Sequence, residues 1–228
     1  TVQGSGASSP LVGQAVIVPG VITRVNNNGF YLQDATGDGN PATSDALFVF
    51  TGSTPYAAVA VGNAVQVSGT VAEFATGGST VTQLTNVSAI VLTGTNQTIA
   101  PTPIVFPTAN EGDLEKIEGM LVRIQGPFTI GQNAYQARYG QLSLAAGGRL
   151  ENPTNRYRPG TPEIAALESS NARRRLILDD GSSLQNMSVM PYLGAGALPR
   201  AGDQLSGALI GVVDYGPRTQ NATPGDYR

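Results

Sequence analysis

Residues 13–20, GQAVIVPG, carry the pattern on which the fold prediction rests, Gly-x-x-Val-x-Val/Ile-x-Gly. The pattern returns at 62–69 (GNAVQVSG) and 119–126 (GMLVRIQG), and in a degraded form at 202–209 (GDQLSGAL). Its alternating aliphatic residues face one side of a β-strand. Its closing glycine indicates a bend or bulge, where the strand curls from one sheet into another. Strands coiled in this way are what a small closed barrel requires.

Strand patterns dominate the rest of the chain as well. Alternating, β-branched segments are separated by Gly, Asn, Asp and Pro turns. The predicted strands lie at 14–25, 29–35, 46–51, 64–74, 81–92, 119–130, 140–145, 174–179 and 205–215. One helix is predicted at 163–173, with Thr161 as its cap and Pro162 at its first position.

The spacing of the repeats predicts a mainly all-β chain with two tandem five-stranded barrels of the OB type. The third and fourth copies lie further apart than the first and second, and the extra length matches an insertion that carries the helix. The alternative is a single extended β-sandwich. The predicted parts are a first barrel at 1–98, a linker at 99–110, a second barrel at 111–216 with its insertion at about 151–173, and a loose tail at 217–228.

The composition excludes several kinds of active site. The 228 residues include no Cys, His or Trp, so a Ser-His-Asp or Cys-His triad and the usual Cys/His zinc site are excluded within this chain. A metal ion would need oxygen ligands, which favours Ca²⁺ or Mg²⁺. No apolar run approaches the ~18–20 residues of a membrane span. Because the residues of these active sites are missing, we expect no catalysis by this chain. Its low charge and its abundant Gly, Ser, Thr and Asn are typical of a secreted bacterial protein.

The loop 34–45 (DATGDGNPATSD) follows the spacing of an EF-hand calcium loop. Counting Asp34 as position 1, Asp38, Asn40 and Asp45 fall at positions 5, 7 and 12, and Gly39 falls at position 6. These four polar residues are the predicted ligands of a structural Ca²⁺ ion. Strands flank the loop, however, and its last position is Asp rather than the longer Glu. The alternative is a solvated hairpin loop rich in Asx turns.

Most of the positive charge lies in the second half of the chain, where tyrosines stand among the arginines. Arg beside an aromatic ring is the combination that holds single-stranded nucleic acid, by phosphate contact and base stacking. The candidate nucleic-acid-binding residues are Tyr31, Arg123, Arg138, Tyr139, Arg149, Arg156, Tyr157 and Arg158. Because neither half of the chain is basic overall, any DNA binding is expected to be weak. The alternative is that these arginines pair with nearby acidic side chains.

The aromatic residues of the first barrel are expected to divide between its two faces. Strand alternation predicts Phe30, Phe48 and Phe50 in the core. The same alternation predicts that Tyr31 is exposed, where its ring could stack on a base.

Several segments, taken in order, resemble one known family. They are 2–23 (VQGSGASSPLVGQAVIVPGVIT), 29–53 (GFYLQDATGDGNPATSDALFVFTGS), 61–74 (VGNAVQVSGTVAEF), 118–130 (EGMLVRIQGPFTI), 138–150 (RYGQLSLAAGGRL), 153–167 (PTNRYRPGTPEIAAL), 174–193 (RRLILDDGSSLQNMSVMPYL) and 202–216 (GDQLSGALIGVVDYG). Together they resemble the non-catalytic region that precedes the endonuclease/exonuclease/phosphatase domain of large secreted bacterial nucleases. The resemblance covers about residues 2–216.

This resemblance implies OB-like domains, secretion and an accessory role beside an enzyme that degrades extracellular DNA. It does not imply catalysis here, because the family's metal-dependent centre uses His and this chain has none. The expected function is a non-catalytic accessory region that positions DNA or an adjacent catalytic domain. The alternative is an extracellular structural or assembly module that polymerises or docks on partner chains, with Ca²⁺ at the loop 34–45.

Overall fold

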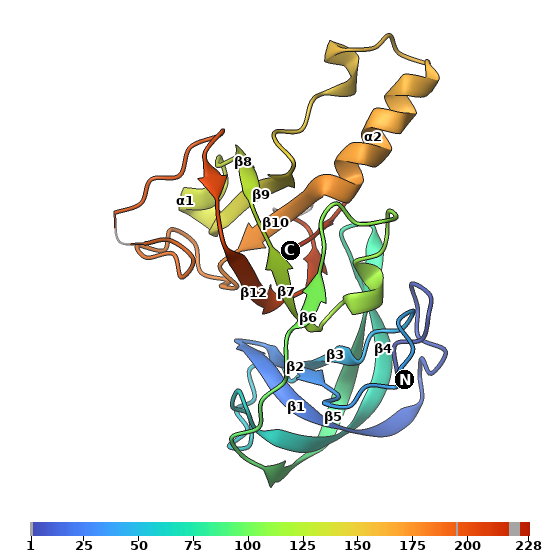
Figure 1. Cartoon of the computed structure of the whole chain (residues 1–228). Coiled ribbons are helices and arrows are strands. Elements are labelled where there is room, and N and C mark those ends of the chain that lie inside the picture. Colours follow the sequence, from blue (N-terminus) through green and yellow to red (C-terminus); the bar gives the residue numbers. More distant parts are fainter. Residues whose placement is uncertain (1, 195, 219–223) are drawn as a thin grey trace. The chain divides into compact units, whose positions relative to one another are not determined.

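The computed structural model describes residues 2–194, 196–218 and 224–228, and it is mainly β, which confirms the predicted fold class (Figure 1). The chain forms two compact units whose segments alternate along the sequence. Unit 1 comprises Thr1–Thr102, Leu114–Arg123 and Ile210–Tyr227. Unit 2 comprises Pro103–Asp113, Ile124–Leu209 and Arg228.

Unit 1 is built on a closed barrel of five strands (Figure 1). Its strands are β1 (Ala15–Asn26), β2 (Gly29–Gln33), β3 (Ala46–Phe50), β4 (Ala64–Thr76) and β5 (Ser79–Gly94). Their order is β1-β2-β3-β5-β4, and β1 pairs with β4 to close the barrel. The β3–β5 pair is parallel, whereas the other pairs are antiparallel. A five-stranded Greek-key barrel of this kind is the architecture of the OB-fold.

The glycines that close the first two sequence repeats lie where barrel strands approach each other closely. A Cβ atom on Gly20 would lie 2.8 Å from Leu32 Cγ, and one on Gly69 would lie 2.9 Å from the Thr85 carbonyl oxygen. The register of the β4–β5 pair also shifts between Ser68 and Thr70, on either side of Gly69. The repeat therefore correctly predicts the irregularity at Gly69. At Gly20 the structure shows only a close approach of strands that leaves no room for a side chain.

Inward-facing aliphatic residues and one phenylalanine fill the barrel. Its core consists of Ile22, Phe30, Leu32, Leu47, Val49, Val65, Val67, Val71 and Leu84. Val65 and Val67 are the alternating residues of the second repeat, which confirms that these residues share one face of the strand. Each fully buried aliphatic or Phe side chain of this kind contributes about 1.5–3 kcal/mol.

Two of the aromatic predictions are wrong. Phe50, expected in the core, is 40% exposed at the end of β3. Tyr31, expected to be exposed, is only 3% exposed, and its ring centroid lies 5.1 Å from that of Phe48. Tyr31 and Phe48 form a second cluster with Val212 and Leu121, outside the barrel core. Tyr31 is buried because later segments of unit 1 fold over this face of the barrel, and strand periodicity cannot reveal such a cover.

Unit 2 contains an open antiparallel sheet with the order β10-β9-β8-β11. Its strands are β8 (Phe128–Gln132), β9 (Gln141–Ala146), β10 (Arg175–Asp179) and β11 (Gln204–Leu205). Among the residues that the structure describes, only the β1–β5 sheet closes into a barrel. The predicted tandem of two closed barrels is therefore not confirmed, although the alternative of one extended β-sandwich does not account for the closed barrel of unit 1.

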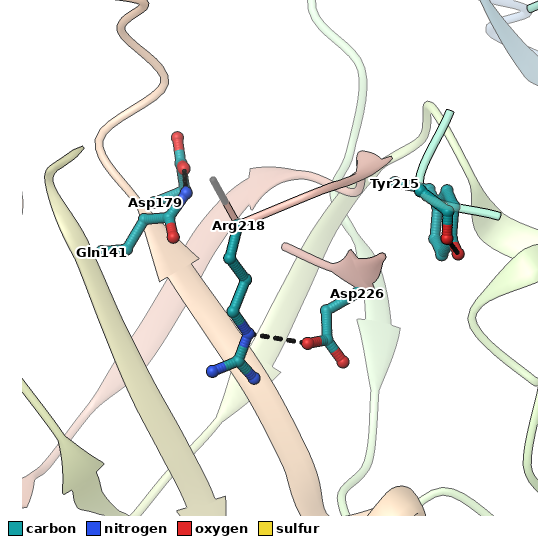
Figure 2. Close-up of polar contacts among 6 residues, drawn as sticks. Gln141, Asp179, Tyr215, Arg218 and Asp226 are labelled. Carbon is teal, nitrogen blue, oxygen red and sulfur yellow. Dashed lines mark hydrogen bonds and ion pairs between the residues drawn. The ribbon is translucent and has the colours of Figure 1, made fainter. Parts of the chain in front are cut away.

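The remaining elements are short. The strands are β6 (Thr102–Ile104), β7 (Leu121–Gln125), β12 (Ala208–Val212), β13 (Tyr215–Gly216) and β14 (Asp226–Tyr227). The helical turns are η1 (Glu115–Ile117), α1 (Gln136–Tyr139) and η2 (Pro153–Asn155). In the segment 217–228, β14 pairs with β13, and Arg218 Nε lies 2.7 Å from Asp226 Oδ2 (Figure 2). Residues 219–223 lie outside the described residues.

The predicted helix is present as α2 (Pro162–Arg174). Thr161 occupies the N-cap position, but its side chain makes no capping hydrogen bond. None of the residues of α2, all of which the structure describes, is buried. The helix and the segment before it extend away from the sheet of unit 2 (Figure 1), and we call residues 147–174 the arm. At its base, the Arg174 guanidinium donates hydrogen bonds to the carbonyl oxygens of Ala146 and Gly148, each at 2.8 Å.

Candidate functional site

One predicted Arg–Tyr pair lies on α1, immediately before β9 rather than within a strand. The Arg138 guanidinium carbon lies 5.2 Å from the centroid of the Tyr139 ring, and Arg138 Nε donates a hydrogen bond to Gln185 Oε1 at 3.0 Å. A second ring, that of Tyr135, lies 6.1 Å from the Tyr139 ring. Arg138 is exposed and both rings are half-buried. One short helix therefore presents a guanidinium and two aromatic rings.

A second Arg–Tyr pair lies in the arm. The Arg156 guanidinium carbon lies 5.5 Å from the centroid of the Tyr157 ring. Arg156 Nη1 also lies 3.3 Å from Glu151 Oε2, and the two side chains are 59% and 56% exposed. An ion pair as exposed as this contributes only about 0–1 kcal/mol, so a phosphate group can compete for the guanidinium. Arg149 and Arg158 are exposed in the same segment.

The structure does not bring all the predicted nucleic-acid-binding residues together. Arg123, exposed on β7, and Tyr31 belong to unit 1, whereas the other six belong to unit 2. Tyr31 does not offer a stacking surface, because its ring is buried and its hydroxyl donates a hydrogen bond to Asp214 Oδ1 at 2.7 Å. The prediction for Tyr31 is therefore wrong. The six residues of unit 2 are divided between α1 and the arm.

Charge is distributed unequally between the two units. Unit 2 holds nine arginines and eight acidic residues, whereas unit 1 holds four basic and eight acidic residues. A negatively charged ligand such as a phosphate backbone is therefore favoured by unit 2 and disfavoured by unit 1.

In unit 1, the outer face of β2 and β3 is covered by the chain itself. This face is the one that OB-folds use to bind oligonucleotides. The Leu121 backbone N–H donates a hydrogen bond to Gln33 Oε1 at 2.8 Å, and the Ser44 hydroxyl donates one to the Glu118 carbonyl oxygen at 2.6 Å. The residues that pack here contact Tyr31 directly. A nucleic-acid base cannot reach this face unless the covering segments move.

The loop 34–45 satisfies its carboxylates with its own hydrogen bonds. Asp34 Oδ1 accepts from the Thr36 backbone N–H and hydroxyl, both at 2.9 Å. Asp38 Oδ1 accepts from the Asn40 N–H at 2.8 Å, and Asp45 Oδ1 accepts from the Asp38 N–H at 3.0 Å. The bonds from these backbone N–H groups are the main reason that the pKa values of Asp34 and Asp38 lie below the ordinary value. Both carboxylates are therefore ionised at neutral pH.

This geometry follows the Asx-turn alternative rather than a calcium loop. In the part of the chain that the structure describes, no group of three or more acidic side chains is arranged to hold a metal ion. The predicted ligand Asn40 instead uses its side-chain oxygen to accept a hydrogen bond from the Ala42 N–H at 3.1 Å. Calcium binding stays a prediction, and these residues offer it no converging set of carboxylates.

A pocket of about 390 Å³ adjoins the same loop. Aliphatic side chains from the N-terminal segment, β1, β2 and β3 line it, among them Leu11 and Leu32. Its charged lining groups are Asp34, Asp38 and Asp45. No sequence pattern indicates this pocket, because residues 2–11 complete its wall only after they have packed against the barrel.

Glu118 is a second feature of unit 1 that the sequence does not indicate. Its side chain is only 3% exposed, and burial, together with the nearby Glu115 and Asp214 carboxylates, raises its pKa to about 8. Glu118 is therefore protonated at neutral pH. Gln3, from the N-terminal segment, shares a hydrogen bond with its side chain. The Oε2 atom of Glu118 has no hydrogen-bond partner among the described residues.

The acidic pair Asp179–Asp180 in unit 2 ends a strand in a turn. Gln141 Nε2 donates a hydrogen bond to Asp179 Oδ2 at 2.8 Å (Figure 2). The other Asp179 oxygen accepts from the Gly181 N–H at 2.7 Å, and Asp180 Oδ1 accepts from the Ser182 N–H at 2.8 Å. These carboxylates hold β9, β10 and the following turn together.

Comparisons with known proteins identify no relative of this chain: no family model matches it, and no curated protein or solved structure matches it. None of the helices that the structure describes is long and apolar enough to cross a membrane. The function must therefore be argued from the chain's own residues.

Proposed function

We propose that this chain is a non-catalytic accessory region of a secreted bacterial nuclease, and that it holds extracellular DNA for an adjacent catalytic domain. The observation that carries this proposal is the pair of Arg–Tyr stacks on unit 2, at 5.2 Å for Arg138 on Tyr139 and 5.5 Å for Arg156 on Tyr157. A guanidinium held over one face of a ring can direct its remaining N–H groups to a phosphate, while the other face of the ring stacks on a base. The ordered resemblance of the sequence to the non-catalytic region of such nucleases supports the same assignment.

Binding is expected to be weak and indifferent to sequence. Unit 2 has only one more basic residue than acidic residues, nine against eight. Base stacking on tyrosine tolerates any sequence, because every base has a π-face. The DNA-binding surface is assigned to α1 and the arm, since the outer face of β2 and β3 is covered.

Fluorescence anisotropy of a labelled single-stranded oligonucleotide tests the proposal. We expect a micromolar Kd at low salt that weakens steeply toward physiological salt. The variants R138A/Y139A and R156A/Y157A should each weaken binding several-fold. The matched control is R24A, which removes an arginine of unit 1 that donates a hydrogen bond to Asn26. Absence of binding at low salt, or an equal loss in the control, would overturn the proposal.

A second candidate function, an assembly or docking module, is favoured by a different observation. Residues 181–199 contain no charged side chain, yet Leu184, Val189 and Leu198 in this segment are 65%, 71% and 81% exposed. Where exposed aliphatic side chains form a contiguous patch, they are typical of protein–protein contact surfaces.

Sedimentation velocity over about a hundredfold range of concentration separates the two functions. If the chain assembles, its sedimentation coefficient should rise with concentration and its affinity for DNA should be low. The V189D/L198D variant should instead sediment as a monomer at every concentration. A monomer at every concentration contradicts assembly and leaves docking of a catalytic domain as the role of this segment.

A further inference from the structure

We propose that the pocket of unit 1 binds an organic cation, an ammonium or guanidinium group carried on an apolar body. Its volume of about 390 Å³ lies within the ~300–1,000 Å³ range of small-molecule sites. The inference is independent of the proposed function, because none of the six candidate DNA-binding residues of unit 2 lines this pocket.

The apolar body of the ligand is required by the walls. Leu32 and Leu47, which line the pocket, are 1% and 4% exposed and belong to the barrel core. Val16 and Val18 of β1 pack against that core and line the pocket as well. Ile17 also lines it while 69% of its surface remains exposed. An alkyl or aryl group placed here removes apolar surface of both partners from water.

The positive charge of the ligand is required by the lining of the pocket. Its three charged residues are Asp34, Asp38 and Asp45, and no described residue of the lining is basic. Turn hydrogen bonds keep the Asp34 and Asp38 carboxylates ionised. An ammonium group is therefore attracted to the pocket, whereas a carboxylate or phosphate is repelled.

The arrangement suits an organic cation better than a metal ion. Ca²⁺ needs six to eight oxygens at about 2.3–2.6 Å, and the described residues contain no group of three acidic side chains that converges in this way. A guanidinium or ammonium group needs only one or two charge-assisted hydrogen bonds. Asp45 Oδ1 accepts a bond from the Asp38 N–H at 3.0 Å, but a carboxylate has about four lone-pair sites. It therefore keeps capacity for a ligand N–H.

Such a cation has two sources with the same chemistry, a free alkylamine or the Lys or Arg side chain of a protein partner. Titrations followed by ¹⁵N–¹H correlation spectra of the full chain distinguish them. The probes are hexylammonium, as the free amine, and Nα-acetyl-lysine amide, as the side chain in a peptide setting. Stronger binding of the first assigns the site to free amines, and stronger binding of the second assigns it to a protein partner. If neither shifts the amides of the pocket lining, the proposal is overturned.

Two further probes with the same apolar body test the charge requirement. We expect hexanol to bind at least about tenfold more weakly than hexylammonium, since it lacks a charge-assisted hydrogen bond, and we expect hexanoate to produce no saturable shift. Equal binding of hexanol and hexylammonium would overturn the proposal, because the carboxylates would then contribute nothing. Competition of Ca²⁺ with hexylammonium at equal concentration would overturn it in favour of a metal site.

The variant D34N/D45N tests which residues hold the cation. Asparagine keeps the side-chain oxygen that accepts the turn hydrogen bonds and removes the charge. We expect at least about a tenfold loss of hexylammonium affinity with an otherwise unchanged spectrum. The control E163Q/E168Q removes two charges from α2, outside the pocket. An equal loss in both variants would show an effect of overall charge and would overturn the site.

The apolar wall is tested by I17T, which keeps a β-branched residue on β1 and removes apolar surface. We expect a several-fold loss of hexylammonium affinity, and an unchanged affinity would contradict the assigned wall. DNA titrations of D34N/D45N should match those of the unaltered chain, so that failure of this site and failure of the proposed DNA-binding function are distinguishable.

Discussion

At the scale of single residues, the buried acid Glu118 shows how folding can hold a carboxyl group neutral. Its side chain is 3% exposed, and desolvation together with Glu115 and Asp214 raises its pKa from 4.5 to about 8. Between these two values the folded state keeps a proton that the unfolded state releases. The stability of unit 1 therefore falls as pH rises from about 4.5 to about 8, and the loss is complete above the folded-state pKa.

The variant E118Q should remove this pH dependence. The neutral amide has nearly the same shape, so we expect the variant to exceed the unaltered chain in stability at pH 9 by about 2–5 kcal/mol. At pH 4 the two chains should be nearly equal. Urea unfolding at both pH values measures the difference. If the unaltered chain loses no stability between pH 4 and pH 9, Glu118 is solvated in solution and the expectation fails.

At the scale of the element, close approach of strands explains why the repeated pattern ends in glycine. Gly69→Ala would place a Cβ atom 2.9 Å from the Thr85 carbonyl oxygen, so we expect a destabilisation of about 1–3 kcal/mol. Gly211→Ala in β12 is the control, because an added Cβ there meets no described atom within 4 Å. Denaturant unfolding compares the variants. Equal effects would show that the destabilisation comes from the loss of glycine flexibility and not from the close approach of the two strands.

The arm contains a helix whose stability depends little on burial. All residues of α2 are described and none is buried, so most of its contacts are local and it should open more readily than the barrel. We expect limited trypsin digestion to cut first after Arg149 and Arg156, before any cut after Arg24 of β1. Arg158 should resist, since Pro159 follows it. Mass spectrometry of the early fragments checks this order. A first cut within the barrel would contradict it.

At the scale of the whole molecule, unit 1 depends on chain segments far beyond its five strands. Leu114–Arg123 and Ile210–Tyr227 belong to it, and Val212 and Leu121 cover Tyr31 and Phe48. A chain ending at residue 98 should therefore expose an aromatic face, bind more of a hydrophobic dye and unfold at lower temperature. Differential scanning calorimetry and dye fluorescence measure both effects. An unchanged Tm would show that the barrel does not need its cover.

Much of the barrel and one helix can be predicted from the sequence alone. The alternation in the second repeat predicts that Val65 and Val67 share one face of their strand, and its closing glycine predicts the irregularity at Gly69, because strand period and side-chain size act locally. The Thr-Pro-Glu start predicts α2 to within one residue at each end. The Arg–Tyr pairs can also be located, because the paired residues are neighbours in the sequence.

Which surfaces of the barrel remain open depends on the tertiary structure and cannot be predicted from local sequence. Tyr31 is covered because its hydroxyl reaches Asp214, 183 residues further along the chain. The pocket exists because Val2 and Leu11 pack against the barrel. Glu118 is neutral because folding buries its side chain and brings the Asp214 and Glu73 carboxylates near it, in addition to the neighbouring Glu115. Local sequence patterns predict which face of a strand is apolar. They do not predict which later segment covers that face, because the cover depends on contacts between residues far apart in sequence.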